Sequence, residues 1–268
     1  MTVLQAQGAS LVRGGRMLVA KANLSIAPGE LVVIVGPNGA GKTSLLKLLT
    51  GEIAVSSGSV AHDGIDIRDW PAWRLASRRA VMAQAQQLAF PFGVVDVVRI
   101  GIDGIGRALD AHARNALIAQ ALARADVMHL ARRDYQTLSG GEQQRVQFAR
   151  VLAQLAAGAS EGSAQVLFLD EPVASLDLCH QFAVMDTATE LAREGTAVVA
   201  VLHDLNLAAT YADRLVVMQR GAIVAEGAPA AILDESLLRE VFDVSITVRT
   251  MPETLLPCIL PQARASSR

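Results

Sequence analysis

Residues 31–44 decide the fold of this chain, and they read LVVIVGPNGAGKTS. Five apolar residues come first and predict a short buried strand, and the leucines at helical spacing after Thr43 predict a helix. Between them, residues 36–43 match the pattern GxxxxGK[ST] in full. Such a turn can direct its backbone N–H groups, and the positive end of the helix dipole, at phosphate groups. This stretch therefore predicts a nucleotide site.

The polar end of this glycine-rich turn indicates how a nucleotide would be held. We expect Lys42 to contact the β- and γ-phosphates and the hydroxyl of Thr43 to bind Mg²⁺. A turn that merely joined a strand to a helix would not need Lys-Thr at its end. The residues expected at the nucleotide are Gly36, Pro37, Asn38, Gly39, Ala40, Gly41, Lys42, Thr43 and Ser44.

Two further apolar runs predict buried strands that end in polar residues. Residues 166–169 are followed by Asp170 and Glu171, and residues 197–202 are followed by His203. Because ligands bind where the carboxyl ends of parallel strands meet, we expect these side chains beside the glycine-rich turn. Asp170 can hold Mg²⁺ through water, and Glu171 can polarise an attacking water as a general base.

The alternation of strands and helices predicts an α/β fold whose parallel sheet is covered on both faces. Residues 94–155 have helical periodicity without a strand candidate, which predicts a helical lobe inserted into the α/β core. Residues 156–165 are small and polar and predict a loop that returns to the core. After Gly221 we expect a hairpin, a short helix over residues 236–242 and a last strand near Ile246.

The composition limits the classes of function. The chain has 268 residues, enough for a large core, and its 24 Lys and Arg nearly balance 26 Asp and Glu, which argues against a nucleic-acid partner. Its apolar runs are far shorter than the ~20 residues needed to cross a bilayer, and its start lacks a secretory pattern. Cys179 and Cys258 lack metal-ligand spacing and are expected as free thiols. From residue 262 onward we expect a frayed end.

A second glycine-rich helix start lies too far along the chain to belong to the first turn. Residues 138–143 read LSGGEQ, and the helix that follows has one apolar stripe. Its N-terminus, at Ser139, Gly140 and Gly141, would present N–H groups and a hydroxyl to an anion. This run is the signature of the ATP-binding-cassette (ABC) family. The chain resembles an ABC transporter ATPase over almost its whole length.

The resemblance implies the architecture: a P-loop NTPase ABC cassette with a mostly parallel core sheet, an N-terminal antiparallel β subdomain and an inserted helical lobe. Residues 1–268 would form one ABC ATPase domain, with the α/β core in residues 1–87 and 160–268 and the lobe in residues 88–159. In this family the lobe points away from its own P-loop, so the signature meets ATP held by a second copy. Residues 174–177 (ASLD) resemble the D-loop at the seam between the two copies.

The resemblance also implies catalytic roles. Gln84 matches the Q-loop glutamine, which touches Mg²⁺ or the lytic water. His203 matches the switch histidine, whose imidazole can hydrogen-bond the γ-phosphate of ATP. The catalytic residues implied are Glu171, His203, Gln84 and Lys42, and the Mg²⁺ ligands implied are Thr43, Gln84 and Asp170.

Some positions depart from the family pattern. Most members place an aromatic ring near the end of the first strand to stack on adenine, but residues 11–16 contain none. Arg13 or Arg16 could stack through the guanidinium plane instead. Val173 stands where Thr is usual and Ala83 where Pro is usual, and neither change removes a catalytic group.

Without a membrane segment of its own, a chain of this kind would act on a separate membrane permease dimer. The resemblance places it at the cytoplasmic face of the inner membrane, with a periplasmic substrate-binding protein as an indirect partner. Residues 88–92 (LAFPF) form an apolar cluster beside the expected Q-loop. This cluster could contact the permease or could belong to the packing of the lobe.

Several stretches resemble one branch of the family, the importers of iron chelates, haem and cobalamin. Residues 203–209 and 211–214 resemble this branch as a whole. Residues 88–92, 176–181 and 256–261, and the extra loop before Val166, look most similar to the haem (hemin) importer ATPases. A ferric-siderophore or cobalamin importer is the alternative within this branch. A soluble ABC clamp on nucleic acid or ribosomes is the alternative of another class. A P-loop kinase or GTPase would leave residues 138–143 unexplained.

Overall fold

The computed structural model of the chain describes residues 2–84, 91–105, 109–159, 164–251 and 256–264. The strands are β1 (Leu4–Arg13), β2 (Arg16–Ile26), β3 (Leu31–Val35), β4 (Ser57–His62), β5 (Ile65–Asp66), β6 (Arg79–Met82), β7 (Val166–Asp170), β8 (Ala197–Val201), β9 (Arg214–Gln219), β10 (Ala222–Gly227), β11 (Ile246–Thr250) and β12 (Pro257–Arg264). The helices are α1 (Lys42–Thr50), α2 (Ala72–Arg78), α3 (Val94–Asp103), α4 (Ala111–Arg124), α5 (Gly140–Gly158), α6 (Leu178–Arg193), α7 (Leu205–Tyr211), α8 (Pro229–Ile232) and α9 (Glu235–Phe242).

A central sheet has the strand order β10-β9-β3-β8-β7-β6. Strands β9, β3, β8, β7 and β6 run parallel to their neighbours, and β10 pairs antiparallel with β9 at one edge. Every residue of β3, β7 and β8 is buried, as expected for parallel strands that are covered on both faces. The predicted mostly parallel α/β core is confirmed.

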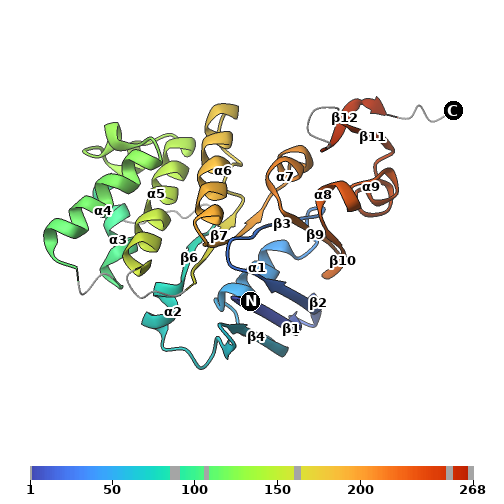
Figure 1. Cartoon of the computed structure of the whole chain (residues 1–268), viewed down its shortest axis with the longest axis horizontal. Coiled ribbons are helices and arrows are strands. Elements are labelled where there is room, and N and C mark those ends of the chain that lie inside the picture. Colours follow the sequence, from blue (N-terminus) through green and yellow to red (C-terminus); the bar gives the residue numbers. More distant parts are fainter. Residues whose placement is uncertain (1, 85–90, 106–108, 160–163, 252–255, 265–268) are drawn as a thin grey trace.

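Alternate residues of each central strand point into two different cores. On one face of β3, Val33 packs with residues of helices α3 to α7. On the other face, Ile34 packs with Leu45 of α1 and with Val19 of the N-terminal strands. This follows from the two-residue period of a strand. Helix α1 therefore lies between the central sheet and the β1–β2 hairpin (Figure 1).

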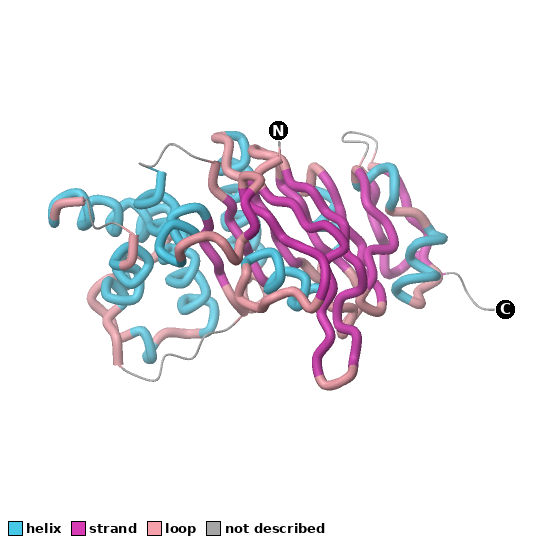
Figure 2. Tube along the Cα trace, turned by 90° about the horizontal axis from the view of Figure 1, so that it is seen from below, coloured by secondary structure: helices cyan, strands magenta, loops and turns pink. Residues whose placement is uncertain are grey.

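The N-terminal strands form a separate antiparallel sheet with the order β2-β1-β4-β5, which confirms the predicted antiparallel subdomain. Helices α3, α4 and α5 gather at the opposite end of the molecule from the C-terminal hairpin, with the strands between them (Figure 2). No helix in the described ranges is long and apolar enough to span a membrane.

Helix α5 joins this helical end to the sheet. The helix contacts α3 and α4, and residues of its second half are hydrogen-bonded to β6. The guanidinium of Arg150 donates to the Val81 carbonyl at 2.8 Å, and the Gln154 amide donates to the Arg79 carbonyl at 2.9 Å. The lobe and the core thus share one continuous helix.

The C-terminal part differs from the prediction in two details. The hairpin is expected after Gly221, but it turns at Gly221 itself. Its first strand, β9, precedes this residue, and β10 follows it. Strand β12 continues to Arg264, which pairs with Ile246, so the prediction of fraying from residue 262 is wrong for residues 262–264. The predicted helix and strand near residues 236–242 and 246 are present as α9 and β11.

Candidate functional site

The glycine-rich turn connects β3 to α1, and its glycines are required by close backbone approaches. Gly36 has φ of +152°, and a Cβ there would lie 2.2 Å from the Met218 carbonyl oxygen. Gly41 has φ of +101°, and its Cβ would lie 2.5 Å from the Leu18 carbonyl oxygen. The turn is braced from outside, since Gly221 donates its N–H to the Ala40 carbonyl at 2.8 Å. Residues with a side chain would push the turn away from both neighbours.

The turn forms the floor of an open cavity of about 440 Å³. Several residues predicted at the nucleotide line it, together with two of the predicted catalytic residues from β7 and β8. The lining residues are Met17, Leu18, Asn38, Gly39, Ala40, Gly41, Lys42, Thr43, Ser44, Glu171, His203, Arg220 and Gly221. Predicted residues from three separate segments therefore meet at one hollow.

Lys42 is directed into the turn. Its ammonium donates to the carbonyl of Gly36 at 2.9 Å and to that of Pro37 at 3.1 Å. The side chain is buried, and this burial lowers the pKa of Lys42 while the charges of Glu171 and Asp170 oppose the change. A cation with so little solvent around it gains strongly from an arriving anion, which would replace the carbonyl contacts.

Asp170 and Thr43 lie together at the end of β7. The hydroxyl of Thr43 donates to the carboxylate of Asp170 at 3.3 Å. Asp170 is only 3% exposed, and its burial, together with the charge of Glu171, raises its pKa. A buried carboxylate beside a hydroxyl suits a hard cation such as Mg²⁺, whose charge would reverse this penalty. The described residues hold no cluster of three or more metal-ligating side chains, so phosphate and water would have to complete the coordination.

Glu171 contacts two other residues that follow neighbouring strands of the central sheet. Its carboxylate accepts a hydrogen bond from the Gln84 amide at 2.8 Å, and its other oxygen lies 2.6 Å from Nε2 of His203. Gln84 follows β6, Glu171 follows β7 and His203 follows β8, which are neighbours in the sheet. The structure therefore brings together three of the four residues to which the resemblance gave catalytic roles, Gln84, Glu171 and His203.

The signature residues lie elsewhere. Ser139 is the N-cap of α5, with a capping box in which the Glu142 carboxylate accepts from the N–H and the hydroxyl of Ser139, both at 2.8 Å. These bonds lower the pKa of Glu142. A Cβ at Gly140 would meet no atom within 4 Å. None of Ser139, Gly140 and Gly141 lines the cavity over the glycine-rich turn.

Two further residues at this site, Gln144 and Arg220, could not be predicted from the sequence. Gln144 donates to the carbonyl of Glu171 at 2.9 Å and accepts from the N–H of Ser175 at 3.2 Å. Arg220 lines the cavity from the β9–β10 turn. Neither lies in a motif whose spacing points to phosphate, and only the docking of α5 and of the hairpin brings them there. Arg13 and Arg16, the candidates for stacking on adenine, are exposed and are not among the lining residues.

Only part of the apolar cluster at residues 88–92 lies within the described residues. Residues 88–90 lie outside the described residues. Pro91 is exposed, whereas Phe92 is half-buried, packs against the core of the helical end and accepts a backbone hydrogen bond from Tyr135 at 2.9 Å. Phe92 thus takes part in packing.

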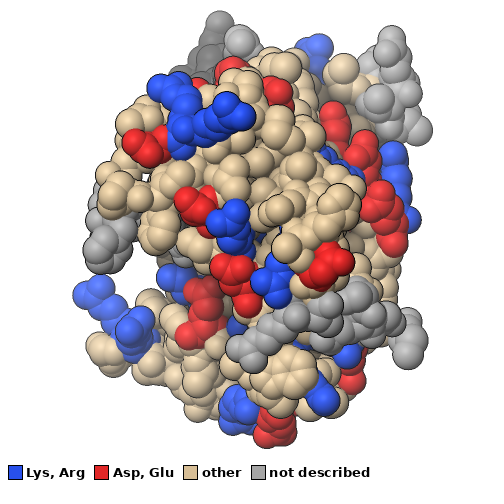
Figure 3. All heavy atoms as spheres, turned by 90° about the vertical axis from the view of Figure 1, so that its left-hand side faces the viewer, with Lys and Arg blue, Asp and Glu red and all other residues tan. Residues whose placement is uncertain are grey.

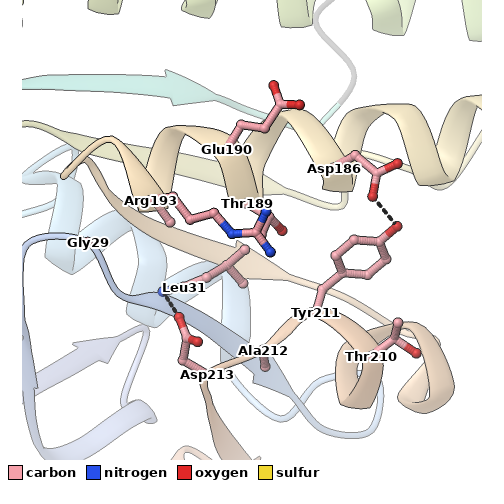
Figure 4. Close-up of a pocket in the computed structure, with 11 residues that line it drawn as sticks. Gly29, Leu31, Asp186, Thr189, Glu190, Arg193, Thr210, Tyr211, Ala212 and Asp213 are labelled. Atoms are coloured by element: carbon pink, nitrogen blue, oxygen red, sulfur yellow. Dashed lines mark hydrogen bonds between the residues drawn. The ribbon is translucent and has the colours of Figure 1, made fainter. Parts of the chain in front are cut away.

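Another hollow of about 530 Å³ lies between α6 and α7 (Figure 4). Tyr211 donates to Asp186 at 2.7 Å across it, and Asp213 accepts from the Leu31 N–H at 2.8 Å. Burial and the Asp186 carboxylate raise the pKa of Tyr211. Tyr211 and Asp213 thus bond to other residues of this hollow, and no residue predicted at the nucleotide lines it. Its bonds tie α7 to α6 and to the start of β3.

Known proteins are similar to this chain in sequence and in fold. A family model described as ABC transporter matches residues 19–174. The chain is 47% identical over 247 residues to the hemin import ATP-binding protein HmuV of Rhodopseudomonas palustris, covering 92% of this chain and 90% of the relative. It is 43% identical over 263 residues to the protein of the same name from Agrobacterium fabrum, covering 98% of this chain and 99% of the relative.

Solved structures agree on the fold. A chain of an ABC transporter in an inward-facing conformation gives a TM-score of 0.78 at 22% identity and covers 97% of both chains. A dimeric ATP-binding cassette in a post-hydrolysis state with ADP and Pi gives a TM-score of 0.74 at 25% identity and covers 84% of this chain and 98% of that one.

The fold and the site define an ATP-binding cassette. The chain belongs to the ABC transporter family. The prediction of an ABC-type transport ATPase is thereby confirmed, and the chain binds ATP.

Proposed function

We propose that this chain is the ATP-hydrolysing subunit of an importer that takes up haem (hemin) through a separate membrane permease. The observation that carries the cargo is the 47% identity, over nearly the full length of both chains, to a relative named as a hemin import ATP-binding protein. The haem assignment rests on this relationship.

The roles of the site residues form part of the proposal. The P-loop and Lys42 bind the phosphates, and Ser44 lies at the same helix start. Thr43, Asp170 and Gln84 would hold Mg²⁺, and the ion would neutralise charge on the phosphates. Glu171 accepts the proton of the attacking water as a general base, and His203 stabilises charge at the γ-phosphate. The meeting of Gln84, Glu171 and His203 supports these roles.

The active form is proposed to be a head-to-tail pair of copies. Ser139 caps the helix N-terminus and Gly140 leaves its backbone open, yet Ser139, Gly140 and Gly141 do not line their own cavity. ATP bound to the P-loop of one copy would meet the signature of the other. The similarity to a dimeric cassette supports this pairing.

The pair would act at the cytoplasmic face of the inner membrane, on a permease dimer. A periplasmic binding protein would deliver haem to the outer side and so be an indirect partner. A nucleic-acid partner is not proposed, because the net charge of the chain is −2 and acidic and basic side chains are interspersed on the face at the helical end (Figure 3).

Reconstitution tests the cargo. The chain is co-purified with its native permease, placed in vesicles, and its ATPase rate is measured with haem-loaded binding protein, with cobalamin- and ferric-siderophore-loaded proteins beside it. Stimulation by the haem-loaded protein alone is expected. A complex carrying Glu171→Gln is the control, since it has the same contacts but lacks the general base.

The alternatives have distinct outcomes in this assay. Stimulation by cobalamin or a ferric siderophore would keep the ATPase mechanism and overturn the haem assignment. Failure to co-purify any membrane protein would favour a soluble ABC clamp.

A further inference from the structure

Gln144 connects two parts of the ATPase site with a single side chain. It stands on α5, five residues after the signature Ser139, and its amide group reaches the loop after β7. Its Nε2 donates to the Glu171 carbonyl at 2.9 Å, and its Oε1 accepts from the Ser175 N–H at 3.2 Å. Both hydrogen-bonding ends of the amide are thus used on one short segment.

The backbone at Glu171 needs such support. Its φ of +54° lies in the left-handed region, which a residue with a side chain adopts only when its surroundings enforce it. The N–H of Glu171 donates to the carbonyl of Val201 at 3.2 Å. The carbonyl of Glu171 accepts from the Gln144 amide at 2.9 Å and, over a longer distance of 3.4 Å, from the Ala174 N–H. The direction of the carboxylate toward Gln84 and His203 depends on this conformation, because it sets the path of the side chain from the backbone.

The same helix end carries the signature turn. Gly141 approaches the loop closely, since a Cβ there would lie 3.0 Å from the Ser175 carbonyl oxygen. Ser175 therefore has its carbonyl against Gly141 and its N–H bonded to Gln144. A shift of the N-terminal turn of α5 must move Ser175 and the Glu171 backbone with it.

We infer that Gln144 is a positioning residue for ATP hydrolysis: it holds the backbone of Glu171 so that the carboxylate is aligned, and it couples that alignment to the signature turn of the same chain. The inference rests on the proposed pairing of two copies. In that pair, the signature of one chain meets the ATP of its partner, while Gln144 links this signature to the chain's own Glu171. Occupancy of one ATP site thereby aligns the general base of the other.

The test compares matched substitutions on α5 in the full-length chain. Gln144→Met keeps the length of the side chain and removes both hydrogen bonds. Gln154→Met is the control, because Gln154 is also half-buried on α5 and also makes two hydrogen bonds, to the carbonyls of Ala76 and Arg79 at 3.0 and 2.9 Å. Thermal unfolding of both variants shows that each is folded.

Steady-state ATP hydrolysis and ATP binding are then measured. For Gln144→Met we expect kcat to fall by roughly tenfold or more with KM and ATP affinity within about twofold of the unaltered chain, since alignment of the base is needed only for the chemical step. The ATP-dependent dimer should still form. For Gln154→Met we expect kcat to stay within about twofold of that of the unaltered chain.

A further variant separates the two contacts of Gln144. Gln144→Glu can still accept from Ser175 but can no longer donate to the Glu171 carbonyl, so we expect the same loss of kcat. Unchanged kcat in either Gln144 variant, or an equal loss in the Gln154 control, would overturn the inference. A chain without substitution that hydrolyses ATP but does not dimerise with it would overturn the proposed pairing instead.

Discussion

At the ends of two central strands, single residues hold backbone conformations that most side chains avoid. Gly36 follows β3 with φ of +152°, and Glu171 follows β7 with φ of +54°. The first conformation is possible because there is no side chain, and the second persists because its N–H, carbonyl and carboxylate are all hydrogen-bonded. A left-handed residue of this kind costs about 1–3 kcal/mol. At Gly36 the conformation allows the close approach to Met218, and at Glu171 it directs the carboxylate toward Gln84 and His203.

Gly36→Ala tests the close approach of the P-loop to β9. The new methyl group would lie 2.2 Å from the Met218 carbonyl, so we expect a loss of about 1–3 kcal/mol in the free energy of unfolding. Chemical denaturation measures this loss. Gly64→Ala is the control, because its φ is +78° but its Cβ would meet no atom within 4 Å. Equal losses in the two variants would assign the effect to backbone conformation alone.

Asp170→Asn tests the cost of the buried carboxylate. The pKa of Asp170 is raised by burial, so its charge destabilises the folded state, increasingly as the pH rises from the ordinary value of 3.8 to the raised one, and fully above it. At pH 7 the neutral amide should therefore raise Tm, by about 2–4 °C for each kcal/mol regained, while Mg²⁺-dependent hydrolysis is lost. Calorimetry and an ATPase assay measure the two effects. A lower Tm than that of the surface variant Asp69→Asn would contradict the expected sign.

At the scale of elements, helices α5 and α7 connect residues of the proposed ATP site to the rest of the fold. Helix α5 begins at the signature, bonds to Glu171 through Gln144 and is fastened to β6 by Arg150. Helix α7 follows His203 directly. Its Asn206 makes two hydrogen bonds to the backbone of Ile259 in β12, at 3.0 and 2.8 Å. The C-terminal hairpin is thus docked on the helix that follows His203.

Ser139→Arg tests the signature turn. A long cationic side chain in place of the N-cap serine removes the capping box and fills the space expected for the partner's ATP. We expect ATP hydrolysis to fall to background, while binding of ATP to the single chain, measured by calorimetry, stays within about twofold. Ser139→Thr keeps a capping hydroxyl and should retain most of the activity. Complete loss of ATP binding in Ser139→Arg would mean that the signature acts within one chain.

Asn206→Leu tests the docking of the C-terminal hairpin. Loss of both bonds to Ile259 should weaken the attachment of β12 by about 1–3 kcal/mol, because the backbone groups of Ile259 lose their partner. Hydrogen exchange of the β11 and β12 amides should then speed up by roughly tenfold or more, with the central strands unchanged. Thr210→Val removes a hydrogen bond within α7, to the Asn206 carbonyl, and should leave the hairpin protected. Equal exchange in both variants would contradict this role of Asn206.

At the scale of the whole molecule, the proposed ATP site would be shared between two copies of the chain. The P-loop, Asp170, Glu171 and His203 lie at one edge of the central sheet, whereas the signature starts a helix whose first turn does not line that cavity. A second copy would supply the missing wall. ATP would then stabilise the pair by binding between the copies, and hydrolysis would release it.

Glu171→Gln tests this pairing. The amide keeps the size of the carboxylate but cannot act as a base, so ATP should bind, persist and hold two chains together. Light scattering should show a doubled molar mass with ATP and Mg²⁺, and a single chain without them. Lys42→Ala, which removes the phosphate contact, should remain a single chain in both conditions and should not turn over ATP. A Glu171→Gln chain that stays single with ATP would contradict the pairing.

Much of this arrangement could be predicted from the sequence, because the decisive signals are local. The apolar strand before Gly36 and the one before Asp170 are continuous buried runs, and the sheet order brings their polar ends together. Gln84 could be assigned only through the resemblance, since a single glutamine has no distinguishing local pattern. Gln144 could not be assigned at all, because its contacts depend on how α5 docks on a loop distant in sequence.

The end of the chain shows a different limit. Residues 262–264 are polar or small and have no apolar alternation, which predicts a frayed end. The structure nevertheless continues β12 through them, since backbone pairing with β11 and the docking of Ile259 on Asn206 supply the order. Backbone hydrogen bonds leave no trace in the pattern of side chains.

Helix α5 has a consequence for how the length of this chain can vary. Its 19 residues span about 28 Å, and it is fixed near both ends, by Gln144 to the loop after β7 and by Gln154 to β6. One inserted residue between these two positions would turn one end relative to the other by about 100°, so at least one set of bonds would be lost. Insertions and deletions must therefore fall outside this helix.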